Sequence, residues 1–238
     1  MTQHILQGRL EKEVLWFQRR DVIKAAASWV ALGGAGAAVA QQRSNVVQLT
    51  GDALLNGRRL DPQQTIMTGD QIRTGPNSSV IFVIGNSAFQ VRQNSVMSVE
   101  RGATLNTVSL LRLITGAVVS VWGKGSNRAI LMPTLTAGIR GTGVYSEVFP
   151  DQGNRSYFCN CYGTVDVESN GAKLVSESVY HQSFWGEVNP QGGPRLTAAK
   201  AINHTDEELE FLARLVSQRT TWQIMGKKGN MDGSGQVY

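Results

Sequence analysis

The feature that most constrains the fold is a series of short apolar runs separated by turn signals, from Val46 to about Phe184. Within runs such as Thr164–Glu168, apolar and polar residues alternate, which places one face of a strand in a core and the other in water. Helical spacing is absent from this stretch, and turn sequences such as Asn56-Gly57 and Asn170-Gly171 separate the runs. The expected strands are Val46–Leu49, Ile72–Thr74, Val80–Ile84, Ala88–Arg92, Val96–Val99, Val108–Ile114, Ala117–Trp122, Val144–Phe149, Ser156–Cys161, Thr164–Glu168 and Lys173–Ser176. We therefore predict an all-β fold, a roll or solenoid-like domain of short strands, with a sandwich as the other arrangement that fits this pattern.

The composition agrees with strands joined by tight turns. The 238-residue chain contains 26 glycines and 6 prolines, and 17% of its residues are charged. The net charge is +5, of which residues 1–40 carry +2 from five basic and three acidic residues, so +3 is left for the remainder. Because the basic residues are scattered rather than clustered, we expect no nucleic-acid partner.

Residues 1–40 have the organisation of an export signal. Arg19 and Arg20 precede a modestly apolar segment, and Ala38 and Ala40 are the small residues that a signal peptidase recognises. The paired arginines, followed by two apolar residues and Lys24, resemble the twin-arginine class of signal. We expect cleavage after Ala40 and release of a chain that folded before export into the periplasm.

An uncleaved leader is the alternative. The apolar segment from Ala25 to Val39 is roughly 15 residues long with a glycine-rich centre, whereas a spanning helix needs about 20 strongly apolar residues. Retention of the leader would anchor the chain in the inner membrane, and we expect membrane contact only in that case.

Residues 189–225 have the pattern of a linker followed by one amphipathic helix. Thr205 and Glu208 form a capping box, and the apolar residues behind it repeat at helical spacing, at Leu209, Leu212, Leu215 and Val216. We expect a helix from Asp206 to about Thr220 that packs on the β domain; a surface for a partner is the alternative. The glycine-rich tail, residues 226–238, is predicted to be disordered.

Three segments of the strand region, taken in order, resemble the FecR domain family. The segment Gly69–Gly75 fits the family pattern G-x-x-I-x-T-G, Met132-Pro133 stands where the family has T-P, and Ile139–Tyr145 resembles its R-G-T segment. The resemblance covers about Val46 to Val188, within a β domain placed at 46–188. Its motif residues in this sequence are Gly69, Asp70, Thr74, Gly75, Pro133, Arg140, Gly141 and Thr142.

The resemblance implies a periplasmic β domain that binds a protein or an envelope ligand, with a role in signalling. The best-known FecR proteins relay an iron-transport signal to a cytoplasmic anti-sigma segment. Because we expect no anti-sigma segment of domain size before the leader here, we expect only the fold and the compartment to carry over, and not the relay to a sigma factor. Regulation of an iron-responsive sigma factor through an uncleaved leader is the alternative.

The residues of the R-G-T segment also predict a structural role without the family resemblance. Gly141 and Gly143 permit backbone angles that other residues resist. We expect Arg140 to act as a structural clasp that caps carbonyl groups or pairs with an acid, and ligand binding is the alternative.

The two cysteines, Cys159 and Cys161, are separated by one residue. In a regular strand they would share a face about 6.6 Å apart, whereas a disulfide needs β-carbons about 3.8 Å apart. A bulge before Gly163 would make a disulfide possible. Three states stay open: reduced buried thiols, a disulfide, and a metal site with His181 that suits zinc or copper. Export of a folded chain favours the metal site, since a cofactor can be loaded before transport.

No sequence motif for an enzyme is present: G-x-S-x-G, H-E-x-x-H and the P-loop pattern are all missing from the chain. His4 lies in the leader and His204 precedes the helix cap, which leaves His181 as the one candidate base. We therefore expect a non-enzymatic protein with no cofactor other than the metal considered above.

Overall fold

A computed structural model describes residues 44–102, 104, 107–125, 128–169, 171–188 and 194–235. The predicted export signal, with Arg19, Arg20, Ala38 and Ala40, lies outside these residues. Among the described helices, none combines the length and the apolar character needed to cross a membrane.

The described residues form one 15-stranded sheet and two α-helices, which confirms the all-β prediction. The short strands are β1 (Val46–Thr50), β2 (Ala53–Leu55), β3 (Arg58–Arg59), β4 (Gln71–Thr74), β5 (Ser79–Ile84), β6 (Ser87–Val91), β7 (Val96–Arg101), β9 (Arg128–Leu131), β12 (Ala172–Ser178), β13 (Tyr180–Val188), β14 (Pro194–Ala199) and β15 (Ser234–Gly235). The long strands are β8 (Val108–Trp122), β10 (Thr136–Phe149) and β11 (Arg155–Ser169). The helical elements are the 3₁₀ turn η1 (Pro150–Gln152), α3 (Asp206–Leu215) and α4 (Thr221–Met225).

Each long strand bends at an internal glycine with a positive φ angle. The angle is 75° at Gly116 in β8, 103° at Gly141 in β10 and 100° at Gly163 in β11. Glycine adopts such angles without the steric cost that a β-carbon brings. The sequence pattern predicted separate strands on either side of Gly116 and of Gly163, but each pair of runs is one strand because pairing continues past the bend.

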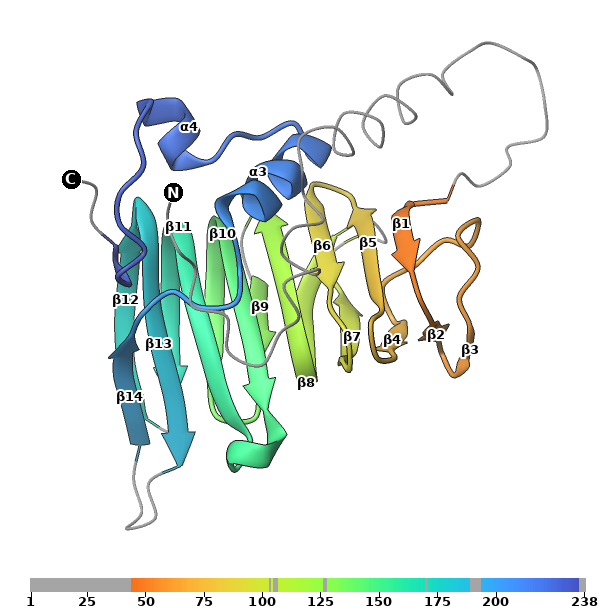
Figure 1. Cartoon of the computed structure of the whole chain (residues 1–238), viewed down its shortest axis with the longest axis horizontal. Helices are drawn as coiled ribbons and strands as arrows, with labels where there is room; N and C mark the ends of the chain where they lie inside the picture. The colour runs from red at the N-terminus through yellow and green to blue at the C-terminus, as the bar shows by residue number, and fades with distance from the viewer. Residues whose placement is uncertain are drawn as a thin grey trace.

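The bends carry the three long strands through two packed layers (Figure 1). In one layer, called the arm-side layer, the strand order is β1-β5-β6-β8-β10-β11-β13-β14. In the other, called the open layer, the order is β3-β2-β4-β7-β8-β9-β10-β11-β12. All these pairs are antiparallel except β8 with β9. The shared strands make the molecule a flattened roll, as the sequence pattern predicted.

Two hydrophobic cores lie on opposite faces of the arm-side layer. Side-chain alternation in β8 points Val118 and Trp122 inward, between the layers, and Val119 and Val121 outward. The inner core, between the layers, includes Ile72, Phe82, Phe89, Val99, Leu111, Val118, Trp122, Ile130, Phe158 and Val165. The outer core includes Ile81, Val119, Val121, Tyr145, Tyr157, Leu209, Phe211, Leu212 and Trp222.

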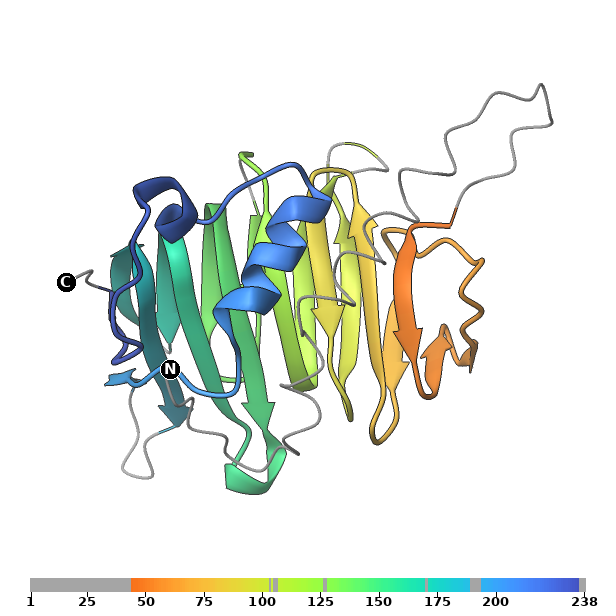
Figure 2. The ribbon, with the colours of Figure 1, turned by 45° about the horizontal axis from the view of Figure 1, so that its top comes forward.

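The outer core is covered by the C-terminal arm, which we define as residues 200–225. Helix α3 lies across β6, β8 and β10 (Figure 2). The predicted capping box of Thr205 and Glu208 is present, and the helix packs on the β domain as predicted. It ends at Leu215 rather than near Thr220, because Ser217 takes a left-handed conformation with a φ of 55°. A second capping box, which the sequence analysis missed, starts α4.

Disorder was predicted for residues 226–238, of which the structure describes 226–235 with partners for some of them, and 236–238 lie outside the described residues. Strand β15 pairs with the start of β13. Before it, Lys228 Nζ lies 2.8 Å from Asp206 Oδ2 at the start of α3. The ion pair therefore joins this segment to the arm, and β15 joins it to the sheet.

Four residues of the FecR-like motif hold the turns on either side of β4: Gly69, Asp70, Thr74 and Gly75. The Asp70 carboxylate accepts a hydrogen bond from the backbone N–H of Met67 at 2.7 Å, and the Thr74 hydroxyl accepts one from Ser95 N–H at 3.0 Å. Gly69 has a φ of 106°. These residues therefore have structural roles.

The other motif residues lie at the start and at the bend of β10. Pro133 is in the turn between β9 and β10. Arg140 donates two hydrogen bonds, of 2.8 and 2.7 Å, to the Asp166 carboxylate on β11. The Thr142 hydroxyl, next to Gly141, donates to a carbonyl of the same neighbouring strand. Arg140 is thus the acid-paired clasp that the sequence predicted.

Candidate metal centre

Cys159 and Cys161 lie in the first half of β11, on the face that the arm covers. The register of β11 with β10 shifts between Asn160 and Tyr162, so Cys161 is the extra residue of a β-bulge. The bulge brings the two Sγ atoms to 3.7 Å, well below the spacing of about 6.6 Å for alternate residues of a regular strand. Both cysteines are free thiols and both are fully buried.

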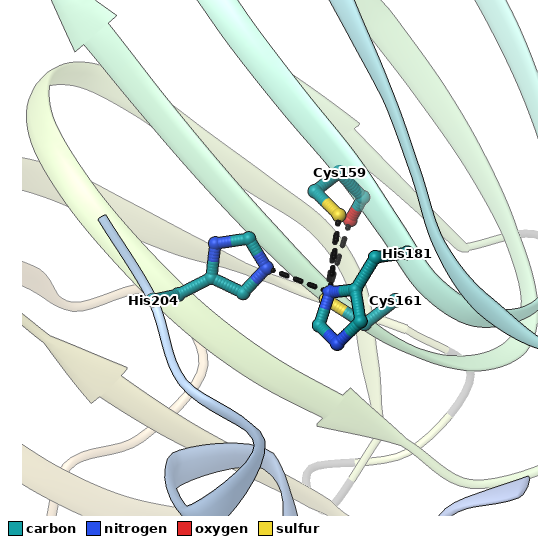
Figure 3. A group of neighbouring side chains, drawn as sticks. All are labelled: Cys159, Cys161, His181 and His204. Carbon is teal, nitrogen blue, oxygen red and sulfur yellow. Dashed lines mark hydrogen bonds between the residues drawn. The ribbon is translucent and has the colours of Figure 1, made fainter. Parts of the chain in front are cut away.

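Two histidines complete a four-residue cluster with these thiols (Figure 3). His181 comes from β13, the strand beside β11, and its Nδ1 lies 3.6 Å from Cys159 Sγ. His204 comes from the arm, and its Nε2 lies 3.0 Å from His181 Nδ1. The chain reaches these positions through left-handed residues, His181 itself with a φ of 51° and Asn203 with a φ of 60°. Non-glycine residues adopt such angles rarely, asparagine and histidine more often than most.

Two distances within the cluster fit the edges of a tetrahedron around zinc, and the 3.0 Å between the two histidine nitrogens is shorter than the edge of about 3.3 Å between two zinc-bound nitrogens. Zinc bonds of about 2.3 Å to sulfur and 2.0–2.1 Å to nitrogen give edges of about 3.8 Å between two sulfurs and 3.6 Å between sulfur and nitrogen. The corresponding distances are 3.7 Å between the cysteines and 3.6 Å between Cys159 and His181. All four ligand atoms lie within 4.8 Å of one another. Cys159, Cys161, His181 and His204 therefore have the chemistry and the spacing of a Cys₂His₂ site.

The outer nitrogen of each histidine fixes which tautomer is present. His181 Nε2 lies 2.9 Å from Asp206 Oδ1, and His204 Nδ1 lies 2.6 Å from the carbonyl oxygen of Ile202. A carboxylate and a carbonyl only accept hydrogen bonds, so both outer nitrogens carry the proton. The inner nitrogens, 3.0 Å apart, would then present two lone pairs to each other. Such an arrangement needs a cation between them, either a proton or a metal ion.

The surroundings shift the pKa values of Cys159, Cys161 and His181 in different directions. Burial alone would raise the pKa of the Cys159 thiol, but hydrogen bonds from Cys161 and the histidines lower it well below the usual range. Burial and the neighbouring Cys159 raise the pKa of Cys161. Burial opposes protonation of His181, yet hydrogen bonds to Asp206 and Cys159 raise its pKa to about 9. In the absence of metal, the cluster therefore holds a thiolate–imidazolium pair.

Asp206 is the outer-shell partner of His181. It is the first residue of α3, where the helix dipole favours a negative charge. Its Oδ2 accepts hydrogen bonds from Tyr180 Oη at 2.9 Å and from Lys228. Burial opposes ionisation, but the contacts with His181 and Lys228 hold the pKa of Asp206 well below its usual range. A carboxylate that orients a ligating histidine in this way is the common outer shell of zinc sites.

Aromatic rings close the cluster from water. Tyr145 stacks on His204 with ring centroids 4.6 Å apart, and Trp222 from α4 stacks on His181 at 5.4 Å. All four ligand residues have 1% or less of their surface exposed. Within the part of the chain that the structure describes, the four side chains are therefore buried away from solvent.

The arm makes two further buried polar contacts beside the cluster. Glu208 of α3 pairs with Arg92 of the sheet, and both side chains are almost fully buried. Asn203 donates a hydrogen bond to Glu147 Oε2 at 2.9 Å, and Tyr145 Oη donates to the same oxygen at 2.6 Å. The interface between arm and sheet therefore contains buried charged side chains as well as apolar ones.

The structure brings together the three residues that the sequence nominated, Cys159, Cys161 and His181. Sequence reasoning missed His204 and Asp206. His204 was set aside because it precedes the helix cap. The only sequence signal for it was its place directly before the capping Thr205, and nothing in that pattern says that the arm returns to β11.

Comparisons with known proteins give no family for this chain. No family model and no curated protein matches it, so the FecR resemblance stays a prediction. Two crystal structures, at 1.65 and 2.50 Å, described as a "putative anti-sigma factor" from Parabacteroides distasonis ATCC 8503, are similar at TM-scores of 0.42 and 0.43 with 8% and 9% identity. The similarity covers 54% and 56% of this chain and 59% and 60% of theirs, so this chain matches about three fifths of that protein's length. Similarity at this level carries no functional conclusion, and what this chain does has to be argued from the cluster itself.

Proposed function

We propose that this protein is a non-enzymatic metal-binding module in which Cys159, Cys161, His181 and His204 bind one zinc ion. The observation that carries the proposal is the pair of inner imidazole nitrogens, His181 Nδ1 and His204 Nε2, 3.0 Å apart with both outer nitrogens committed as donors. A zinc ion would satisfy both lone pairs and both thiolates at once.

The ligand set supports a structural rather than a catalytic ion. Four protein ligands fill a tetrahedral zinc site, whereas catalytic sites keep one position for water or substrate. The ring stacking of Tyr145 and Trp222 supports the same reading, because it keeps water away from the histidines. We therefore propose no reaction at this centre.

We propose that the module works outside the cytoplasm, as a periplasmic domain that binds a protein or envelope ligand. The export signal expected in residues 1–40 supports this compartment. A metal loaded before export is compatible with a twin-arginine signal. Sequencing the amino terminus of the mature protein tests the proposal: a start near Gln41 is expected, and an intact leader would instead favour the membrane-anchored regulator.

Metal analysis of the purified full chain tests the proposed centre. After growth with zinc and, separately, with copper, we expect one zinc ion per chain. Cobalt(II) substitution should give the visible bands of a tetrahedral ion and thiolate charge-transfer bands. Cys159→Ser and His204→Ala should each weaken zinc binding by at least about 100-fold, since even changes to outer-shell partners cost 10–100-fold.

Ser146→Ala is a matched control. Ser146 is buried in β10, and its hydroxyl has no hydrogen-bond partner among the described residues. Its replacement should leave zinc content and the cobalt spectrum unchanged. Wild-type protein that binds neither zinc nor cobalt would refute the metal centre. One copper ion on the same ligands would refute zinc as the resident ion.

A further inference from the structure

The ligands of the proposed centre are divided between two parts of the chain. Cys159, Cys161 and His181 lie on adjacent strands of the arm-side layer, and His204 lies on the arm. The outer-shell Asp206 also belongs to the arm. A metal ion bound by all four ligands therefore cross-links the arm to the sheet.

We propose that this metal ion is a latch: its binding holds the arm on the sheet, and its loss lets the arm open locally. The inference rests on the metal centre proposed above and adds its regulation. Zinc would bind the docked arm with four ligands and the open arm with three, so metal must shift the balance towards the docked form.

The sheet has what it needs to stay folded when the arm opens. The inner core is built from residues of the two layers, and none of its members lies in the arm. Its strands keep their hydrogen-bonded neighbours on both sides of β8, β10 and β11. Opening of the arm is therefore a local event rather than unfolding of the domain.

The docked arm depends on a cation at its centre. Docking places Asp206 and Glu208 of α3 in a buried interface that also holds two cysteines and Glu147. Described cationic partners offset part of this negative charge, through Arg92 on Glu208 and Lys228 on Asp206. A zinc ion on the four ligands would add two positive charges to this interface and join the arm to the sheet. Without the ion, His204 is held to His181 at this point only by a hydrogen bond through a shared proton, and the metal–ligand bonds that cross from the sheet to the arm are lost.

Opening would uncover an apolar face of the sheet. The arm covers Ile81, Val119, Val121, Tyr145 and Tyr157, which are buried in the docked form. Loss of metal would expose these side chains together and change the surface that the domain presents. In this way the metal would control access to one face of the module.

Amide hydrogen exchange on the full chain tests the latch. Three samples are compared under reducing conditions: zinc-loaded protein, protein treated with a chelator, and His204→Ala with zinc. At free zinc about 100-fold above the dissociation constant of the docked form, and with an open form that binds zinc at least about 100-fold more weakly, linkage predicts exchange in residues 200–215 at least about 50-fold slower than in the chelated protein. Strands β8 and β10 should exchange at unchanged rates. Arg214→Ala, an exposed change on α3, is the control and should keep the zinc effect.

Metal content is measured on the same samples, so the two proposals fail separately. If no zinc binds, the metal centre is refuted. If one zinc binds and the exchange of the arm stays the same after its removal, the latch is refuted while the centre stands. If chelation speeds exchange equally in β8 and β10, the opening is global and the latch is again refuted. Should His204→Ala fail to fold, the comparison of loaded and chelated wild type decides the matter.

Discussion

At the scale of single residues, Asp206 connects the helix to the proposed metal centre. It holds His181 Nε2 with one oxygen and Tyr180 with the other, and Lys228 neutralises it from the solvent side. Its position as the first residue of α3 adds the helix dipole to this set. Asp206 therefore fixes both the tautomer of His181 and the direction of its inner nitrogen.

Removing the charge of Asp206 should weaken metal binding without removing a ligand. In Asp206→Asn, the amide oxygen can still accept from His181, but the basicity of the imidazole falls. We expect the zinc affinity to drop 10–100-fold with one ion still bound at saturation, as measured by competition with a chromophoric chelator. Asp151→Asn, the same change at an exposed carboxylate in η1, is the control. An affinity equal to that of wild type would contradict the role of Asp206.

At the scale of elements, the bent strands show what the sequence could and could not predict. The alternation of apolar and polar residues predicted strands on both sides of Gly163, and the capping box of Thr205 and Glu208 predicted the start of α3. A glycine between two apolar runs, however, is equally consistent with a turn or a bend. Which one forms depends on neighbouring strands that local pattern does not include.

The site was predictable to the same extent. The close spacing of Cys159 and Cys161 marked them as a pair, and His181 was the one histidine expected inside the β domain. His204 joins them only because the arm crosses the outer face of the arm-side layer. Contacts at this sequence separation follow from the packing of α3, which no periodicity in the linker indicates.

The bend at Gly163 should be intolerant of a side chain for two separable reasons. A β-carbon there would lie 2.7 Å from the carbonyl oxygen of Gly141 and 2.8 Å from Thr142 Cβ, in addition to the cost of a φ of 100°. Gly171, with a φ of 94°, has nothing within 4 Å of such an atom. An unfavourable φ costs about 1–3 kcal/mol, so Gly171→Ala should lose that amount and Gly163→Ala at least about 1 kcal/mol more. Denaturant unfolding measures the free energy of unfolding of both variants. Equal losses would show that a β-carbon at Gly163 meets no steric clash beyond the cost of its φ angle.

At the scale of the whole molecule, the two cores divide the protein into parts of different stability. The inner core joins the two layers through strands that belong to both, whereas the outer core joins the sheet to a single arm. Elements that are attached by one face and few strands open more readily than shared strands. The inner core should therefore set the global stability, and the outer core the opening of the arm.

Truncation of one buried leucine in each core tests whether the two cores control different opening events. Leu113 of β8 lies in the inner core and Leu212 of α3 in the outer core, each with 1% or less of its surface exposed. Truncation of a buried leucine to alanine costs about 2–5 kcal/mol. Leu113→Ala should lower the free energy of unfolding that hydrogen exchange reports at the protected amides throughout the sheet. Leu212→Ala should speed hydrogen exchange of the arm and leave the most protected amides of β8 and β10 nearly unchanged. An equal loss of protection in the sheet for both variants would mean that arm and sheet unfold as one unit.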